Sequence, residues 1–166
     1  MSKWDVLIER SFNGLIYAYS WYLDITCDND WDALVEGDYE SVMPLPKGKK
    51  KFGFLYIYRP LFTQQLGVFS ASEITDEKVK RFLSHIPRSY LYLEMSLNTS
   101  NHFEDDSFEI SNGVTHLLNL NQSYDSLYKN YNQDRKKNLK KAFKKTLTIT
   151  KEALPLDVIN LFKTNR

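Results

Sequence analysis

The sequence predicts a mixed α/β fold of the α+β class, with a central, mostly antiparallel sheet and helices on both of its faces. Short apolar runs with strand character alternate with segments that carry helix-capping residues, which is the pattern of a mixed domain. The 166 residues are 42% hydrophobic and 26% charged, as in globular proteins with a core of their own. The single cysteine, Cys27, excludes an internal disulfide framework and a multi-cysteine zinc site.

Three longer helices are predicted, over residues 2–10, 75–86 and 134–146. Ser2 and Thr75 are favourable N-caps, because a hydroxyl group can accept a hydrogen bond from a backbone N–H of the first turn. In the third helix Leu139, Ala142 and Phe143 recur at helical spacing, so we expect them to face the core. Shorter helices are expected from Ser20 to Cys27, after Ser123 and from Pro155.

At least five strands are predicted in one predominantly antiparallel sheet. Residues 31–35 and 39–43 are expected to pair around a three-residue loop at Gly37, and Pro44 and Pro46 to end the second strand. Further strand candidates lie at residues 15–19, 52–58, 90–97 and 114–120, and residues 147–150 are β-prone.

The predicted elements form a single domain over residues 1–152, with residues 153–166 as the start of a second half or as a C-terminal tail helix. The first residues are charged and lack the apolar core of a signal peptide. No apolar run reaches the roughly 20 residues of a membrane span. We therefore expect a cytoplasmic protein.

The charge is segregated along the chain, although the formal net charge is only +1. Residues 24–40 hold seven acidic residues and no base, whereas residues 135–145 hold seven bases and no acid. Like charges at helical spacing repel, so a purely structural helix would gain from acidic partners. The basic run therefore predicts a face that binds the phosphates of RNA, of a nucleotide diphosphate or of an anionic membrane. The alternative is a solvated helix flank.

Two polar clusters contain residue types that can bind metal ions. Asp28, Asp30 and Asp32 imitate the start of a calcium loop, but Ala33 and Tyr39 stand where such a loop needs Gly and Glu, which excludes an EF-hand. His102 and the acids at 104–106 have no further ligands at a suitable spacing, so a polar loop is the better interpretation. No metal site is predicted.

Two neighbouring amides, Gln64 and Gln65, precede Gly67 after an aromatic strand. Such amides can bind a peptide or a sugar, and a glycine lets backbone approach a ligand closely. The alternative is a strand edge with structural amides.

The segment 128–142 has the sequence YKNYNQDRKKNLKKA. It resembles the segment that closes the first domain of FemAB-like acyltransferases, in which a tyrosine precedes a basic-Asn-aliphatic-Lys-Lys-Ala pattern. The segments from Trp4 through residues 31–35, 43–46 and 64–69 resemble a related group of bacterial proteins built on the GNAT fold. The resemblance covers most of the chain, and no single motif in it is catalytic.

This resemblance implies a GNAT-like domain that forms the N-terminal half of an acyltransferase, which moves an acyl or aminoacyl group to an amine. The best-known members use aminoacyl-tRNA to modify a cell-wall peptide. The implied partners are tRNA or a nucleotide-linked cell-wall precursor, and a second GNAT-like domain. Acyl-CoA or aminoacyl-tRNA would be the donor of a full-length protein. No cofactor is expected for this chain, because the Gly-rich loop that holds coenzyme A in acetyltransferases of this fold is not visible.

Two groups of residues are predicted to bind substrate. We expect Tyr58, Arg59, Gln64 and Gln65 to line an acceptor groove. The residues expected to anchor a phosphate-bearing donor or acceptor are Arg135, Lys136, Lys137, Asn138, Lys140 and Lys141. No catalytic residue is identified. Two alternatives remain: a non-catalytic module whose basic helix binds nucleic acid or an anionic surface, and a structural domain without a ligand.

Overall fold

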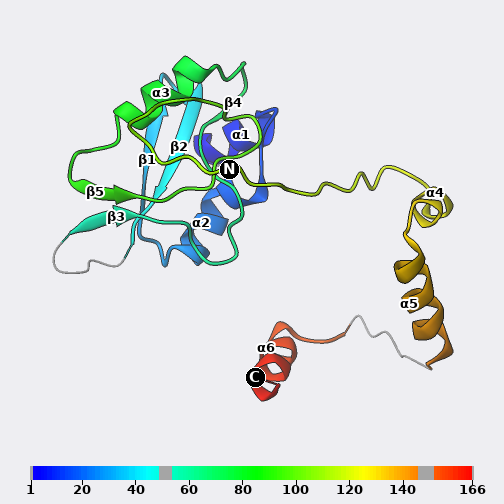
Figure 1. Ribbon diagram of the computed structural model, residues 1–166. Helices are drawn as coiled ribbons and strands as arrows, with labels where there is room; N and C mark the ends of the chain where they lie inside the picture. The colour runs from blue at the N-terminus through cyan, green and yellow to red at the C-terminus, as the bar shows by residue number, and fades with distance from the viewer. Residues whose placement is uncertain (1, 49–53, 146–151, 166) are drawn as a thin grey trace. The chain divides into compact units, whose positions relative to one another are not determined.

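The computed structural model describes residues 2–48, 54–145 and 152–165 (Figure 1). The chain divides into two units, Met1–Ile110 and Ser111–Arg166. The first unit contains α1 (Lys3–Arg10), a 3₁₀ turn (Ile16–Ala18), α2 (Ser20–Thr26), β1 (Trp31–Glu36), β2 (Ser41–Pro46), β3 (Leu55–Ile57), β4 (Phe69–Ser70), α3 (Asp76–Ser84) and β5 (Tyr90–Leu93). The second contains α4 (Tyr124–Lys129), α5 (Gln133–Lys144) and α6 (Pro155–Thr164). The single domain expected over residues 1–152 stays a prediction.

The capped helices form as predicted. The Ser2 hydroxyl accepts a hydrogen bond from Asp5 N at 3.2 Å, and the Thr75 hydroxyl accepts one from Lys78 N at 3.3 Å. Each of these bonds satisfies a first-turn donor that a helix cannot satisfy internally. The predicted helices over residues 2–10 and 75–86 are therefore confirmed as α1 and α3, with α3 ending slightly earlier.

A three-stranded antiparallel sheet forms the centre of the first unit, in the order β1-β2-β4. The β1–β2 register runs from Trp31 opposite Pro46 to Glu36 opposite Ser41, and Ser41 also lies opposite Ser70. Because neighbouring residues of a strand point to opposite faces, β2 supplies side chains to two cores. Val42 packs in one core, and Met43 in the other.

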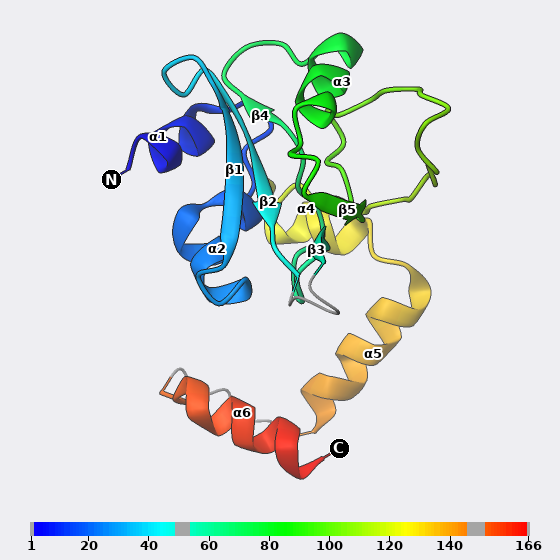
Figure 2. The same ribbon diagram turned by 90° about the vertical axis from the view of Figure 1, so that its left-hand side faces the viewer.

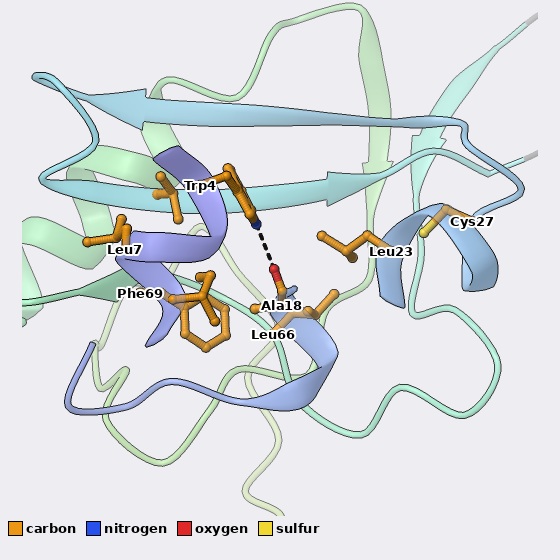
Figure 3. Packing of buried hydrophobic residues seen from close by; sticks show 9 residues of the cluster. Trp4, Leu7, Ala18, Leu23, Cys27, Leu66 and Phe69 are labelled. Carbon is orange, nitrogen blue, oxygen red and sulfur yellow. Dashed lines mark hydrogen bonds between the residues drawn. The ribbon is translucent and has the colours of Figure 1, made fainter. Parts of the chain in front are cut away.

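Helices cover both faces of this sheet, as predicted. The first core joins the sheet to α1 and α2 (Figure 3), and Trp4 Nε1 donates a hydrogen bond to Ala18 O at 2.7 Å within it. The Cys27 side chain is buried in this core, in agreement with its interpretation as a small hydrophobe. The second core joins the sheet to α3, which is labelled in Figure 2. Val79, Phe82 and Leu83 are the residues of α3 in this core.

The second strand of the hairpin continues past the first of the two prolines that are predicted to end it. Pro44 lies inside β2 and pairs with Ala33, whereas β2 does end at Pro46, which pairs with Trp31. The Pro46 carbonyl accepts a hydrogen bond from Tyr58 N at 3.4 Å, so the polar groups of Pro46 face away from β1. Pro44 has the same parity along the strand. Both prolines therefore place their missing N–H on the side where β1 needs no donor.

The single five-stranded sheet is also a wrong prediction, because the five strands of the described residues form two sheets. β3 and β5 pair with each other in parallel. Among the described residues, β3 meets the end of β2 through a single bridge between Lys47 and Ile57, which consists of the hydrogen bonds from Tyr58 N to Pro46 O and from Gly48 N to Tyr56 O. Pro44 and Pro46 offer no N–H on that side, which prevents a longer ladder between the two strands.

Other strand candidates have a different structure. Residues 16–18 form a 3₁₀ turn instead of a strand. Residues 114–120 have no strand partner among the described residues, and their apolar side chains are exposed. Residues 52 and 53 and the β-prone segment 147–150 lie outside the described residues.

The basic helix of the second unit forms as predicted, but its apolar side chains are not in a core. α5 has no buried residue, and Phe143 is 80% exposed. Three apolar side chains in a helix with six bases are too few to build a core with a six-residue neighbour such as α4. Pro155 starts α6 in the first helical position, as expected. No helix of the described residues is long and apolar enough to cross a membrane.

Candidate nucleic-acid interface

Five lysines gather on one face of α5. Together with Gln133 and Asp134, they line a shallow hollow along the helix, and all the described lining residues come from α5. At 100° per residue the five lysine side chains lie within an arc of about 140°. We call the five the lysine strip: Lys136, Lys137, Lys140, Lys141 and Lys144.

The strip differs from the predicted set in two respects. Arg135 and Asn138 point to other sides of α5 and do not line the hollow, whereas Lys144 is an additional member. The predicted members Lys136, Lys137, Lys140 and Lys141 lie together. The i, i+1, i+4, i+5 spacing in the sequence contains this signal.

The strip is positioned by the cap of α5 and by the turn that precedes it. The Asn132 side chain accepts a hydrogen bond from Arg135 N at 2.8 Å, which starts the helix. Asn130 N and Tyr131 N bond back to the carbonyls of Leu127 and Tyr128, both at 3.2 Å. Local hydrogen bonds therefore fix the short connection between α4 and α5.

A row of tyrosines on α4 and the following turn adjoins the first turns of α5. The ring centroids of Tyr124 and Tyr128 are 6.1 Å apart, and those of Tyr128 and Tyr131 are 5.9 Å apart. Lys136 Nζ lies 5.5 Å from the centroid of the Tyr128 ring and donates a hydrogen bond to Lys129 O at 2.9 Å. We call Tyr124, Tyr128 and Tyr131 the tyrosine row. Their i, i+4, i+7 spacing in the sequence is a signal of this row, although none of the three is among the predicted site residues.

Repulsion within the strip lowers the stability of α5. Lys136, Lys140 and Lys144 follow each other at i, i+4, as do Lys137 and Lys141. Each like-charge pair at this spacing destabilises a helix by about 0.2–0.5 kcal/mol, so the three pairs cost about 1 kcal/mol. Within the described residues no ion pair joins these lysines to a carboxylate. The repulsion among these lysines is therefore not offset by carboxylates of the described residues.

The predicted acceptor-groove residues do not form one hydrogen-bonded group in the part of the chain that the structure describes. Gln64 Oε1 accepts a hydrogen bond from the Tyr17 hydroxyl at 3.2 Å, and Arg59 Nη1 donates to Ser96 Oγ at 3.4 Å. The Tyr58 ring lies 5.9 Å from that of Tyr56, and Gln65 is half-buried. The groove therefore stays a prediction.

Gly67 allows the Asn101 side chain of the same chain to approach the backbone closely. A Cβ atom at Gly67, where φ is +104°, would lie 2.3 Å from Asn101 Oδ1. That oxygen accepts a hydrogen bond from Val68 N at 2.6 Å. The buried Asn98 amide donates to the carbonyls of Leu66 and Val68 at 3.0 and 3.3 Å. The amides around Gly67 thus hold the chain in place, a role that the sequence does not indicate.

A buried Ser–Lys cluster lies between β2, β4 and α3. Lys78 Nζ donates to Ser41 Oγ at 3.1 Å and lies 3.6 Å from Glu36 Oε2. Ser41 and Ser70 have no exposed surface, so no substrate can reach them as nucleophiles. Burial raises the pKa of Glu36, but the Ser41 hydroxyl, Arg81 and Lys78 overcome this effect, and the net shift is downward.

The acids between α2 and β2 bind groups of the chain. Lys47 Nζ lies 2.8 Å from Asp30 Oδ1 and 3.3 Å from Asp32 Oδ1, and the Tyr90 hydroxyl donates to Asp32 Oδ2 at 2.5 Å. The hydrogen bond from Tyr90 lowers the pKa of Asp32. Burial acts in the opposite direction, but Lys47 also lowers the pKa, and the net shift is downward. Burial and Asp32 raise the pKa of Tyr90. Among the described residues, no three His, Cys, Asp or Glu side chains are placed to hold a metal ion.

A comparison of the chain with protein-family models, curated proteins and solved structures finds no match. The resemblance to FemAB-like acyltransferases therefore stays a prediction.

Proposed function

We propose that the chain binds a phosphate-bearing ligand through the lysine strip. We favour RNA, in particular tRNA, over a nucleotide-linked cell-wall precursor. The observation that carries this proposal is the gathering of five lysines on one face of α5, without a carboxylate partner among the described residues. A dense array of phosphates would relieve the repulsion within the strip.

The length of the strip suits several phosphates. Lys136 and Lys144 are eight residues apart, which corresponds to about 12 Å along the helix axis. One strand of a nucleic-acid duplex carries a phosphate about every 3.4 Å along its axis. The strip therefore spans about three to four phosphates, a number comparable to its lysines. A single nucleotide diphosphate would occupy only part of it, which favours the polymer.

The salt dependence of tRNA binding tests the proposal. Each phosphate contact contributes about −0.7 to −0.9 to the slope of log affinity against log salt. Replacing Lys136, Lys137, Lys140 and Lys141 by Gln should therefore flatten the slope by up to about three units. The smaller variant Lys137→Gln/Lys141→Gln should flatten it by about half as much.

A matched control separates local contacts from net charge. Lys80→Gln/Arg88→Gln removes the same charge as the double strip variant, from exposed positions of the first unit, and should leave the slope almost unchanged. An equal effect of the two double variants would contradict binding at the strip. Absence of tRNA binding at low salt, or binding to anionic vesicles but not to tRNA, would overturn the RNA proposal.

As a second function we propose the N-terminal half of an acyltransferase with a GNAT-like fold, acting in the cytoplasm on an amine acceptor. The sequence of residues 128–142 supports this proposal, and so does the sheet with helices on both faces. A second GNAT-like domain would contribute to the donor site. Calorimetry with acetyl-CoA should detect no tight binding to this chain, and a micromolar dissociation constant would contradict the assignment of the donor site to a second domain.

A further inference from the structure

The tyrosine row adjoins the lysine strip at Lys136. Lys136 belongs to the strip, and its ammonium group is also 5.5 Å from the centroid of the Tyr128 ring. The same side chain thus links the phosphate-binding face to the aromatic rings. Tyr128 in turn contacts both Tyr124 and Tyr131.

Tyr124 is the ring best placed to accept a ligand. It is 57% exposed, whereas Tyr128 and Tyr131 are half-buried. α4 has no buried residue, so the exposed ring is not needed to fill a core. Proteins bind single-stranded nucleic acid with exposed aromatic rings beside a cationic surface. The phosphates contact the Lys and Arg side chains, and the nucleobases stack on the rings.

We propose that the tyrosine row stacks unpaired nucleobases, so that the ligand of the lysine strip is a single-stranded stretch of RNA. This inference rests on the proposed RNA-binding function and specifies its ligand. In a duplex the faces of the bases are covered by their neighbours, and only the phosphates would be within reach of α4 and α5. Tyr124 provides the stacking surface, while Tyr128 positions it through ring contact and is held by Lys136. Stacking tolerates any base, so little sequence preference is expected.

Fluorescence anisotropy with three labelled probes tests this inference. The probes are a 12-nucleotide oligoadenylate, a strand of equal length and charge that lacks the bases, and a 12-base-pair RNA duplex. The full chain should bind oligoadenylate at least about fivefold more tightly than the abasic strand, which corresponds to the weaker end of stacking on one aromatic side chain. It should also prefer oligoadenylate to the duplex.

Substitutions at Tyr124 locate the effect. Tyr124→Leu should remove most of the preference for the base-bearing strand but leave the salt dependence unchanged, because the lysine contacts remain. Tyr124→Phe should keep the preference, since it retains the ring. Tyr92→Leu is the matched control, because Tyr92 is similarly exposed at 58% but lies in the first unit. Circular dichroism shows whether each variant keeps its helices.

The possible outcomes separate the two proposals. Equal binding of the abasic strand and oligoadenylate, with a salt slope that the lysine variants flatten, would overturn base stacking and leave RNA binding intact. Equal or tighter binding of the duplex would do the same. Failure of all three probes to bind at low salt would overturn both. The comparison of the three probes uses the wild-type chain, and the salt slope uses the lysine variants, so both answers remain available even if a Tyr124 variant does not fold.

Discussion

Replacing Gly67 by alanine tests the packing of the first unit most directly. The new Cβ would lie 2.3 Å from Asn101 Oδ1 and 2.9 Å from Leu97 Cδ2, at a φ of +104°. Both the backbone conformation and the space at this position exclude a side chain. The Asn101 amide must therefore move, and its movement breaks the bonds to Val68 N at 2.6 Å and Val68 O at 3.0 Å.

The expected loss of stability has two parts. A non-glycine residue at positive φ costs about 1–2 kcal/mol. A buried backbone group left without its hydrogen bond costs about 1–3 kcal/mol. Gly67→Ala should therefore lower the free energy of unfolding by about 2–5 kcal/mol, a large part of the stability of an ordinary domain. With a typical urea dependence, the midpoint of unfolding would fall by about 1–2 M.

Urea unfolding followed by tryptophan fluorescence measures this loss. Trp4 and Trp31 report on the first core, with ring centroids 5.1 Å apart. Gly113→Ala is the matched control, because no heavy atom lies within 4 Å of its added Cβ, and it should change stability by less than about 0.5 kcal/mol. Because Asn101→Ala removes the clashing amide, the double variant should cost less than the sum of the single ones. A loss below 1 kcal/mol for Gly67→Ala would refute the reasoning.

Two further predictions concern single contacts of the first unit. Because the pKa of Asp32 is lowered in the folded chain, the stability that its carboxylate contributes is present above the ordinary pKa of about 3.9 and is lost as pH falls through the lower folded value. Tyr90→Phe removes the hydrogen bond to Asp32 and should cost about 1 kcal/mol at pH 7. It should also reduce the loss of stability with falling pH that urea unfolding measures between pH 6 and 3. An identical acid profile for the two proteins would contradict this assignment. Phe62 has a φ of +64° and is 88% exposed, so Phe62→Gly should leave the thermal midpoint unchanged or raise it, and a drop of several degrees would show that the ring makes a stabilising contact.

The features that the sequence predicted well depend on neighbouring residues. A hydroxyl group at a helix N-terminus acts within three residues, and the caps at Ser2 and Thr75 are accordingly in place. The grouping of lysines on α5 follows from helical periodicity alone, once the helix is known to form. The pairing of β1 with β2 is similarly local, because a short loop at Gly37 joins them.

The features that the sequence did not reveal depend on residues far apart in the chain. Pro44 is tolerated inside β2, and Pro46 at its end, because of the partners on the two sides of the strand, and no local rule states which side a missing N–H faces. Gly67 is constrained by Asn101, 34 positions away. Residues 114–120 have strand propensity, but without a partner among the described residues they form no strand. The contact between Tyr128 and Tyr131 in the tyrosine row depends on the conformation of the turn between α4 and α5.

The two charged segments of the chain have different physical roles, although they look alike in the sequence. Acids from residues 24–40 are engaged by groups of the first unit: Asp24 by Trp31 Nε1, Asp30 and Asp32 by Lys47, Glu36 by Lys78 and Arg81, and Asp38 by Lys3. These acidic side chains stabilise the fold that surrounds them. The lysine strip has no such carboxylate partner in the described ranges, and its lysines repel each other. The Lys136 ammonium group is engaged by Lys129 O and the Tyr128 ring, but the other four lysines of the strip have no such contact among the described residues. Because the acids have partners in the fold and these four lysines do not, the strip is the part of the described chain best suited to bind an anion.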